Sequence, residues 1–267
     1  MSGIFRLPAP FHRWRRRWFV PSAAGAALPK SNTAEGGTDN VAVTTGNSGG
    51  ASGNAWNAVT NPSGTLIFDT ERVVDTGAMA YKMQMPDGNP VLLHWDFAPV
   101  AELYFRMYVN IGDVPTTGAG LEFLRIKQAG GAHVFLIELG TTTDNGAGKF
   151  TLYDQGGLNQ FSTVNAYNDD AWYRLELHLI KGDATAGTIE FHIYDLHETT
   201  PLESFVDTSA DVGSVDMGSL DFGGTGQGGG IWELWLDDIG VTNVDWLGPT
   251  GSPAAGGQKF MPVVVAA

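Results

Sequence analysis

Alternation of apolar and polar positions is the strongest signal along this chain. In AELYFRMYVNI, residues 101–111, the odd positions from Leu103 to Ile111 are apolar, and the even positions from Glu102 to Asn110 carry polar or amphipathic side chains. Because successive side chains on a strand point to opposite faces of the sheet, this pattern predicts a strand with one buried face. WYRLELHLI, residues 172–180, and TIEFHIYD, residues 188–195, repeat the pattern.

The last two of these segments are predicted to form a hairpin around KGDATAG, residues 181–187. With the turn centred near Ala184, Glu176 faces His192 and His178 faces Glu190 on the two strands. Both are favourable cross-strand pairs, so the side chains support the register that the turn implies.

Further strand patterns recur at short intervals and define the fold class. They are predicted over residues 79–85, 91–96, 120–127, 132–139, 149–153, 219–223 and 231–242. No long amphipathic helical stretch occurs, and 36 glycines and 13 prolines among 267 residues favour a turn-rich chain. We therefore expect one all-β domain, an antiparallel two-sheet β-sandwich of the jelly-roll type.

The two ends of the chain differ from this body. Residues 1–34 mix arginines, aromatics and prolines without a strand or helix period and are expected to form an extended arm. Residues 35–249 then form the sandwich, and residues 250–267 a short tail. No apolar run is long enough to span a membrane, so membrane insertion is not expected. The absence of cysteine excludes disulfides and thiolate metal sites.

Charge divides the chain in the same way. The net charge is −14, yet five arginines lie within the first 17 residues, so the remainder is more acidic still. An acidic body repels nucleic acid, which is therefore not expected as a partner, and a basic arm favours an acidic one. Arginine and tryptophan dominate protein-interface anchors. The candidate anchoring residues are accordingly Arg13, Trp14, Arg15, Arg16, Arg17 and Trp18.

IWELWLDDIG, residues 231–240, is the most distinctive short stretch. As a regular strand it would place Glu233, Trp235, Asp237 and Ile239 on one face, and its other face would carry Trp232, Leu234, Leu236 and Asp238. Alpha carbons four residues apart on a strand are separated by about 13 Å, which suits neither spacing of glycosidase carboxylates.

A structural role for this stretch is favoured, followed by sugar binding through an indole flanked by carboxylates. The outer positions of residues 101–111 add aromatic and basic groups to the same hypothesis. The candidate glycan-binding set is Tyr104, Arg106, Tyr108, Glu233, Trp235 and Asp237. No catalytic set is assigned.

Metal and cofactor signals are weak. The six histidines form no zinc-binding spacing, and no nucleophile elbow occurs. Calcium commonly occupies turn-rich acidic loops, so it stays open as a ligand of DTSADVGSVDMGSLD, although the spacing fits no EF-hand. The aspartates concerned are Asp207, Asp211, Asp216 and Asp221. No other cofactor is expected.

Three stretches carry a resemblance to a known class of proteins. They are EGGTDNVAVTTGNSGGASGNAWNAV at residues 35–59, the Trp-Tyr-Arg run at 172–174 and WLDDIGVTNVDWLGP at 235–249. The chain resembles bacteriophage virion proteins, mostly from phages of actinobacteria. The resemblance implies a concanavalin A-like, or laminin G-like, jelly roll in a minor tail or capsid-surface decoration protein.

The resemblance also implies location and partners. The chain would be made in the host cytoplasm and reside in the virion, bound to major capsid or tail proteins and to further copies of itself. We expect a structural protein without enzymatic activity, anchored by its ends and displaying the sandwich to host cell-surface polysaccharide. Two alternatives remain: a carbohydrate-active enzyme of the glucanase or lyase type, and a free lectin.

Overall fold

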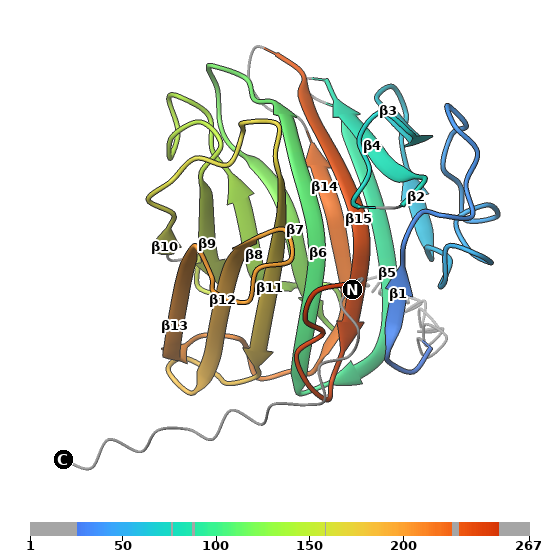
Figure 1. The fold of residues 1–267 in the computed structure, drawn as a ribbon. Helices are drawn as coiled ribbons and strands as arrows, with labels where there is room; N and C mark the ends of the chain where they lie inside the picture. The colour runs from blue at the N-terminus through green and yellow to red at the C-terminus, as the bar shows by residue number, and fades with distance from the viewer. Residues whose placement is uncertain (1–25, 76, 87–88, 158, 226–229, 251–267) are drawn as a thin grey trace, which may run out of the picture.

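The chain folds as two antiparallel sheets stacked face to face (Figure 1). The computed structural model describes residues 26–75, 77–86, 89–157, 159–225 and 230–250. Within them it contains fifteen strands and no helix, hence none that could cross a membrane. The predicted all-β, two-sheet sandwich is confirmed.

The front sheet lies nearer the viewer in Figure 1. Its strand order is β13 (Glu203–Ala210), β12 (Gly187–Asp195), β11 (Trp172–Ile180), β6 (Glu102–Asp113), β15 (Trp232–Thr242), β4 (Ala80–Met85) and β3 (Thr65–Asp69), and β1 (Lys30–Asn32) also pairs with β15.

The back sheet covers the inner face of the front sheet. Its order is β10 (Asn159–Ser162), β9 (Phe150–Asp154), β8 (His133–Leu139), β7 (Leu121–Gln128), β14 (Met217–Thr225), β5 (Pro90–Val100) and β2 (Ala58–Thr60).

The core lies between the sheets and follows the predicted alternation. Leu103, Phe105 and Met107 are buried in it, so the even-numbered side chains of β6 are left on the outer face. The hairpin of β11 and β12 has the predicted register, with Glu176 opposite His192 and His178 opposite Glu190. Ala184, at the centre of its turn, has a φ of 58°.

Five strands were not predicted: β1, β2, β3, β10 and β13. The first four have three to five residues, which are too few positions for a period to be recognised. β13 has eight residues, but Ala210 is its only buried one, so it lacks a buried apolar face. β1 pairs with residues 239–241 of β15, so the sandwich begins within the segment expected to be an arm. The candidate anchoring residues, Arg13 to Trp18, lie outside the described residues.

One irregularity in β15 shapes the outer face. Asp237 pairs with Tyr108 and Gly240 pairs with Arg106, so β15 holds one residue more than β6 over this interval. This is a β-bulge, and Asp238 within it has a φ of 45°. The predicted alternation is therefore wrong beyond Asp237, because Ile239 turns into the core.

Candidate functional site

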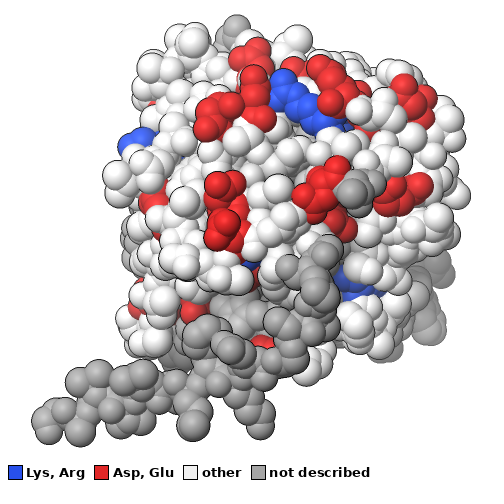
Figure 2. Space-filling model, viewed as in Figure 1, with Lys and Arg blue, Asp and Glu red and all other residues white. Residues whose placement is uncertain are grey.

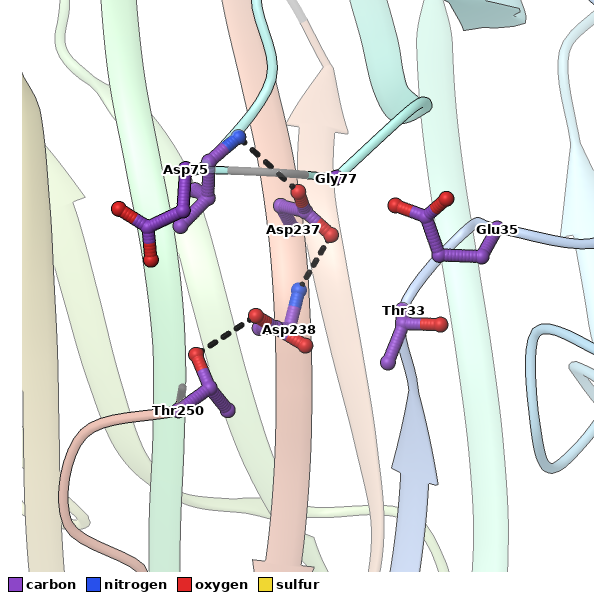
Figure 3. Close-up of a pocket in the computed structure, with 8 residues that line it drawn as sticks. Thr33, Glu35, Asp75, Gly77, Asp237, Asp238 and Thr250 are labelled. Atoms are coloured by element: carbon purple, nitrogen blue, oxygen red, sulfur yellow. Dashed lines mark hydrogen bonds between the residues drawn. The ribbon is translucent and has the colours of Figure 1, made fainter. Parts of the chain in front are cut away.

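A pocket of about 290 Å³ opens on the outer face of the front sheet (Figure 3). The lining residues come from four places: the segment after β1, the loop between β3 and β4, the bulge of β15 and the segment that follows β15. They are Thr33, Glu35, Val74, Asp75, Gly77, Asp237, Asp238 and Thr250. Four of these eight residues carry a carboxyl group.

Asp237 is the most buried of the four acids, with 2% of its surface exposed. Its carboxyl oxygens accept hydrogen bonds from the backbone N–H of Asp238, at 2.7 Å, and of Val74, at 3.3 Å. Burial, followed by the neighbouring charge of Asp238, raises the pKa of Asp237 to about 8. The side chain is therefore mainly protonated at neutral pH and has a proton to donate.

Glu35 faces Asp237 across Gly77. A Cβ atom built on Gly77 would lie 2.7 Å from Glu35 Oε1 and 3.7 Å from Asp237 Oδ2, so both oxygens border the same small space. Glu35 is exposed to solvent and accepts hydrogen bonds from the N–H of Ala78 at 2.9 and 3.0 Å. A buried acid beside an exposed carboxylate is an arrangement that can give and take protons.

A second chain of contacts joins the pocket to β6. His197, just after β12, pairs through Nε2 with Asp75, and its Nδ1 lies 3.5 Å from Tyr108 Oη. The same tyrosine oxygen accepts a hydrogen bond from the N–H of Thr250 at 3.0 Å. The pocket wall and the outer face of β6 are thus one connected polar network.

The basic side chains of the outer face in the described part of the chain are all engaged. Carboxylates dominate the view of this face in Figure 2, and Lys and Arg show at few places. Each cation is held by acceptors of the protein: Arg72 by Asn110 and Asp170, Arg106 by the carbonyls of Asp238 and Gly248, Arg174 by Glu176 and the carbonyls of Leu196 and Glu198, and Lys82 by Glu71 and Glu233.

The predicted glycan-binding residues are all on the front sheet, but they are not in one place. Tyr104, Arg106 and Tyr108 lie along the outer face of β6 and contact the segment after β15. Tyr104 is half-buried, whereas Arg106 and Tyr108 are buried, with 8% and 0% of their surface exposed. Asp237 lines the pocket. Glu233 lies four residues before Asp237 on β15, where it pairs with Lys82 at 3.0 Å.

Trp235 is buried, which removes the sugar-stacking role considered for it. Its indole is 1% exposed, with the Arg72 guanidinium 4.1 Å and the Lys82 ammonium 4.6 Å from the ring centroid. Its Nε1 donates a hydrogen bond to Asp69 at 3.2 Å. A ring covered in this way has no free face for a ligand.

The acidic loop considered for calcium does not converge. Asp221 pairs with His94 and Lys127 on the back sheet, and Asp216 pairs with Lys181. Asp207 and Asp211 each accept a hydrogen bond from the backbone N–H two residues further along the chain. Among the described residues, no group of three or more His, Asp or Glu side chains could hold a metal ion.

Sequence patterns missed three of the four pocket acids: Glu35, Asp75 and Asp238. Glu35 and Asp75 lie in irregular segments, where periodicity carries no information about direction. The period of two assigned Asp238 to the core face, and only the bulge brings it to the outer face. The adjacent aspartates on this predicted strand could have indicated a bulge. In a regular strand one of the two side chains would point into the core.

Comparison with known proteins identifies the fold. No protein-family model matches the chain, and no curated protein matches it either. Among solved structures it is similar to the alginate lyase Aly36B, with a TM-score of 0.52 and 12% identity over 83% of this chain and 99% of that one. An endo-β-1,4-glucuronan lyase from the fungus Trichoderma reesei gives a TM-score of 0.51 and 14% identity over 70% and 91%.

A third neighbour is the cellulose-induced protein Cip1, with a TM-score of 0.50 and 16% identity over 82% of this chain and 98% of that one. At such identities the likeness establishes the jelly-roll fold alone. It nevertheless contradicts the prediction that the chain is not an enzyme, because the neighbours include polysaccharide lyases.

Proposed function

We propose that the protein is a polysaccharide-cleaving enzyme that hydrolyses glycosidic bonds in the outer-face pocket. The observation that carries the proposal is the pairing of Asp237, buried and proton-bearing, with the exposed Glu35 across Gly77. The jelly-roll likeness to polysaccharide-active proteins supports it.

The two carboxyl groups would take complementary parts. Asp237 donates its proton to the glycosidic oxygen as the bond to the leaving sugar breaks. Glu35 stabilises the positive charge that develops on the sugar ring, or removes a proton from the attacking water. Because Glu35 comes from a separate segment, the wide spacing that counted against Glu233 with Asp237 does not apply.

Hydrolysis of a neutral polysaccharide is favoured over elimination from a uronate chain. Elimination beside a carboxylate requires a group that neutralises that carboxylate. Arg72, Arg174 and Lys82 on this face are held by protein acceptors, and Arg106 Nε donates to the carbonyl of Asp238 on β15. The pocket itself has four acids. An anionic sugar unit would meet repulsion there.

The test is the release of reducing ends from a panel of neutral glucans and polyuronates. Hydrolysis gives no unsaturated, ultraviolet-absorbing product, so absorbance separates it from elimination. Asp237→Asn and Glu35→Gln should each lower kcat by about a hundredfold or more, the usual contribution of a positioned acid or base. Glu233→Gln is the matched control and should keep activity, since Glu233 lies outside the pocket. Full activity in Asp237→Asn would refute the proposal.

A place in a phage particle remains a second proposal, supported by the likeness at residues 35–59. An enzyme of this kind would act there on host envelope polysaccharide. Mass spectrometry of purified particles should find the chain in stoichiometric amounts. Its absence from particles, with free enzyme in the lysate, would count against the virion location and leave the enzymatic proposal intact.

A further inference from the structure

The segment that follows β15, residues 243–250, lies over the outer face of the front sheet, and we call it the strap. In Figure 1 it is the dark red segment that leaves the end of β15 and passes in front of β6. It forms no strand. Thr250 near its end also lines the pocket, so the strap and the pocket share a border.

Trp246 is the main contact of the strap. Its ring centroid lies 5.5 Å from that of Tyr104, 5.8 Å from that of His178 and 5.3 Å from that of His192. Tyr104 and His178 are stacked on each other at 4.2 Å, and the indole lies across the edges of both rings. The strap thus places a flat ring over an aromatic floor made by β6, β11 and β12.

Backbone groups of the strap satisfy the polar side chains beside that floor. The carbonyl of Gly248 accepts a hydrogen bond from Arg106 Nη1 at 2.7 Å, and the N–H of Thr250 donates one to Tyr108 Oη at 3.0 Å. The hydroxyl of Thr250 donates to Asp238 at 2.7 Å. A sugar presents the same combination, a ring for stacking and hydroxyl groups that donate and accept.

The strap is only partly buried against the sheet. Asn243, Val244 and Asp245 are exposed, and Val244 retains 79% of its surface. Leu247 also contacts the sheet, since its Cδ1 lies 2.9 Å from the position of a Cβ atom built on Gly240. No residue of the strap takes part in the strand pairing of β15, so the strap can leave while β15 keeps that pairing. The aromatic floor would then join the pocket in one open groove.

We propose that the strap covers a binding groove for a neutral polysaccharide, continuous with the pocket, and that a long substrate displaces the strap when it binds. The proposal rests on the proposed function, because it assigns the sugar units next to the one being cleaved. A chain fragment short enough to fill the pocket alone would bind with the strap in place.

Trp246→Ala in the full chain tests the proposal. Loss of the indole removes the competitor for the aromatic floor, so KM for long soluble glucans should fall by about tenfold while kcat stays unchanged. Val244→Ala, in the same strap but exposed, is the matched control and should leave KM as it is. Amide hydrogen exchange of residues 243–250 in the wild-type protein should rise on addition of a long glucan.

The following outcomes would overturn the proposal. A rise in KM for Trp246→Ala would mean that the indole is itself a sugar-binding residue. An unchanged KM, or unchanged exchange of residues 243–250, would mean that substrate does not displace the strap. Failure of the proposed function looks different, because the wild-type protein would then cleave no polysaccharide. In that case, calorimetric titration of a long glucan into Trp246→Ala and Val244→Ala still compares the affinities of the two variants. Equal affinities, or no binding by either variant, would refute the groove.

Discussion

Asp237 has a protonation state that depends on two residues of irregular backbone. Val74 and Asp238 donate their N–H groups to it, and the bulge adds the charge of Asp238 beside it. Asp237 was predictable as a candidate for sugar binding. Its protonation state was not, because its burial and the approach of Glu35 depend on segments distant in the sequence.

The stability of the protein should depend on pH through this residue. The pKa of Asp237 rises from 3.8 to about 8 on folding, so the folded state holds a proton that the unfolded chain releases between these values. The free energy of unfolding should therefore fall as the pH rises from about 4 to about 8. Asp237→Asn removes this titration and should flatten the profile over that interval.

Urea denaturation at a series of pH values measures the effect. Asp216→Asn, which alters a partly exposed ion pair with Lys181 away from the pocket, serves as the control and should keep the wild-type slope. Identical slopes in wild type and Asp237→Asn would show that the carboxyl group is already ionised in the folded protein at neutral pH.

At the scale of elements, regular strands were predictable and their interruptions were not. The alternation in residues 101–111 was enough to predict a strand, because every second position indicates the same buried face. The charge pairs of the β11–β12 hairpin were enough to predict its register, because they all agree with one turn position. The bulge in β15 and the three-residue strand β1 depend instead on pairing partners elsewhere in the chain. The strap has no periodic pattern, and only the folded sheet reveals what it covers.

Gly223 in β14 illustrates a local demand of the sheet. Its φ is 78°, and a Cβ atom there would collide with the carbonyl oxygen of Val91 on β5. Gly223→Ala should destabilise the fold by more than about 1 kcal/mol. Gly50 has a similar φ of 69° and nothing within 4 Å of a Cβ atom, so Gly50→Ala isolates the backbone strain. Equal losses in thermal denaturation would exclude a contribution from the collision.

For the molecule as a whole, the segment before β2 helps to join the two sheets. Trp56, with 2% of its surface exposed, stacks on Trp95 of β5 at 4.2 Å and contacts Phe222 of β14 and Tyr81 of β4 at 5.5 and 5.8 Å. One side chain therefore bridges the back and front sheets. The segment's glycine-rich and asparagine-rich composition predicted turns and gave no sign of this contact.

Trp56→Ala should lower the free energy of unfolding by about 3–5 kcal/mol, the usual effect of emptying a buried indole site. Urea denaturation should show a lower midpoint with an unchanged slope, as expected for a cavity in an otherwise native fold. Val164→Ala, at a position with 76% exposure, should change stability by less than about 0.5 kcal/mol. A loss below about 1 kcal/mol for Trp56→Ala would mean that the sheets hold together without this bridge.

The number of residues in the β15 bulge determines how many carboxyl groups line the pocket. Deleting Asp238 would leave Asp237 opposite Tyr108 and Gly240 opposite Arg106, with Ile239 still directed inward, so neither flanking stretch of the ladder has to slide. The protein would lose one wall carboxylate and the field it exerts on its neighbour. Acidity in the pocket can therefore be tuned by a single-codon deletion, a route that substitution scans never sample.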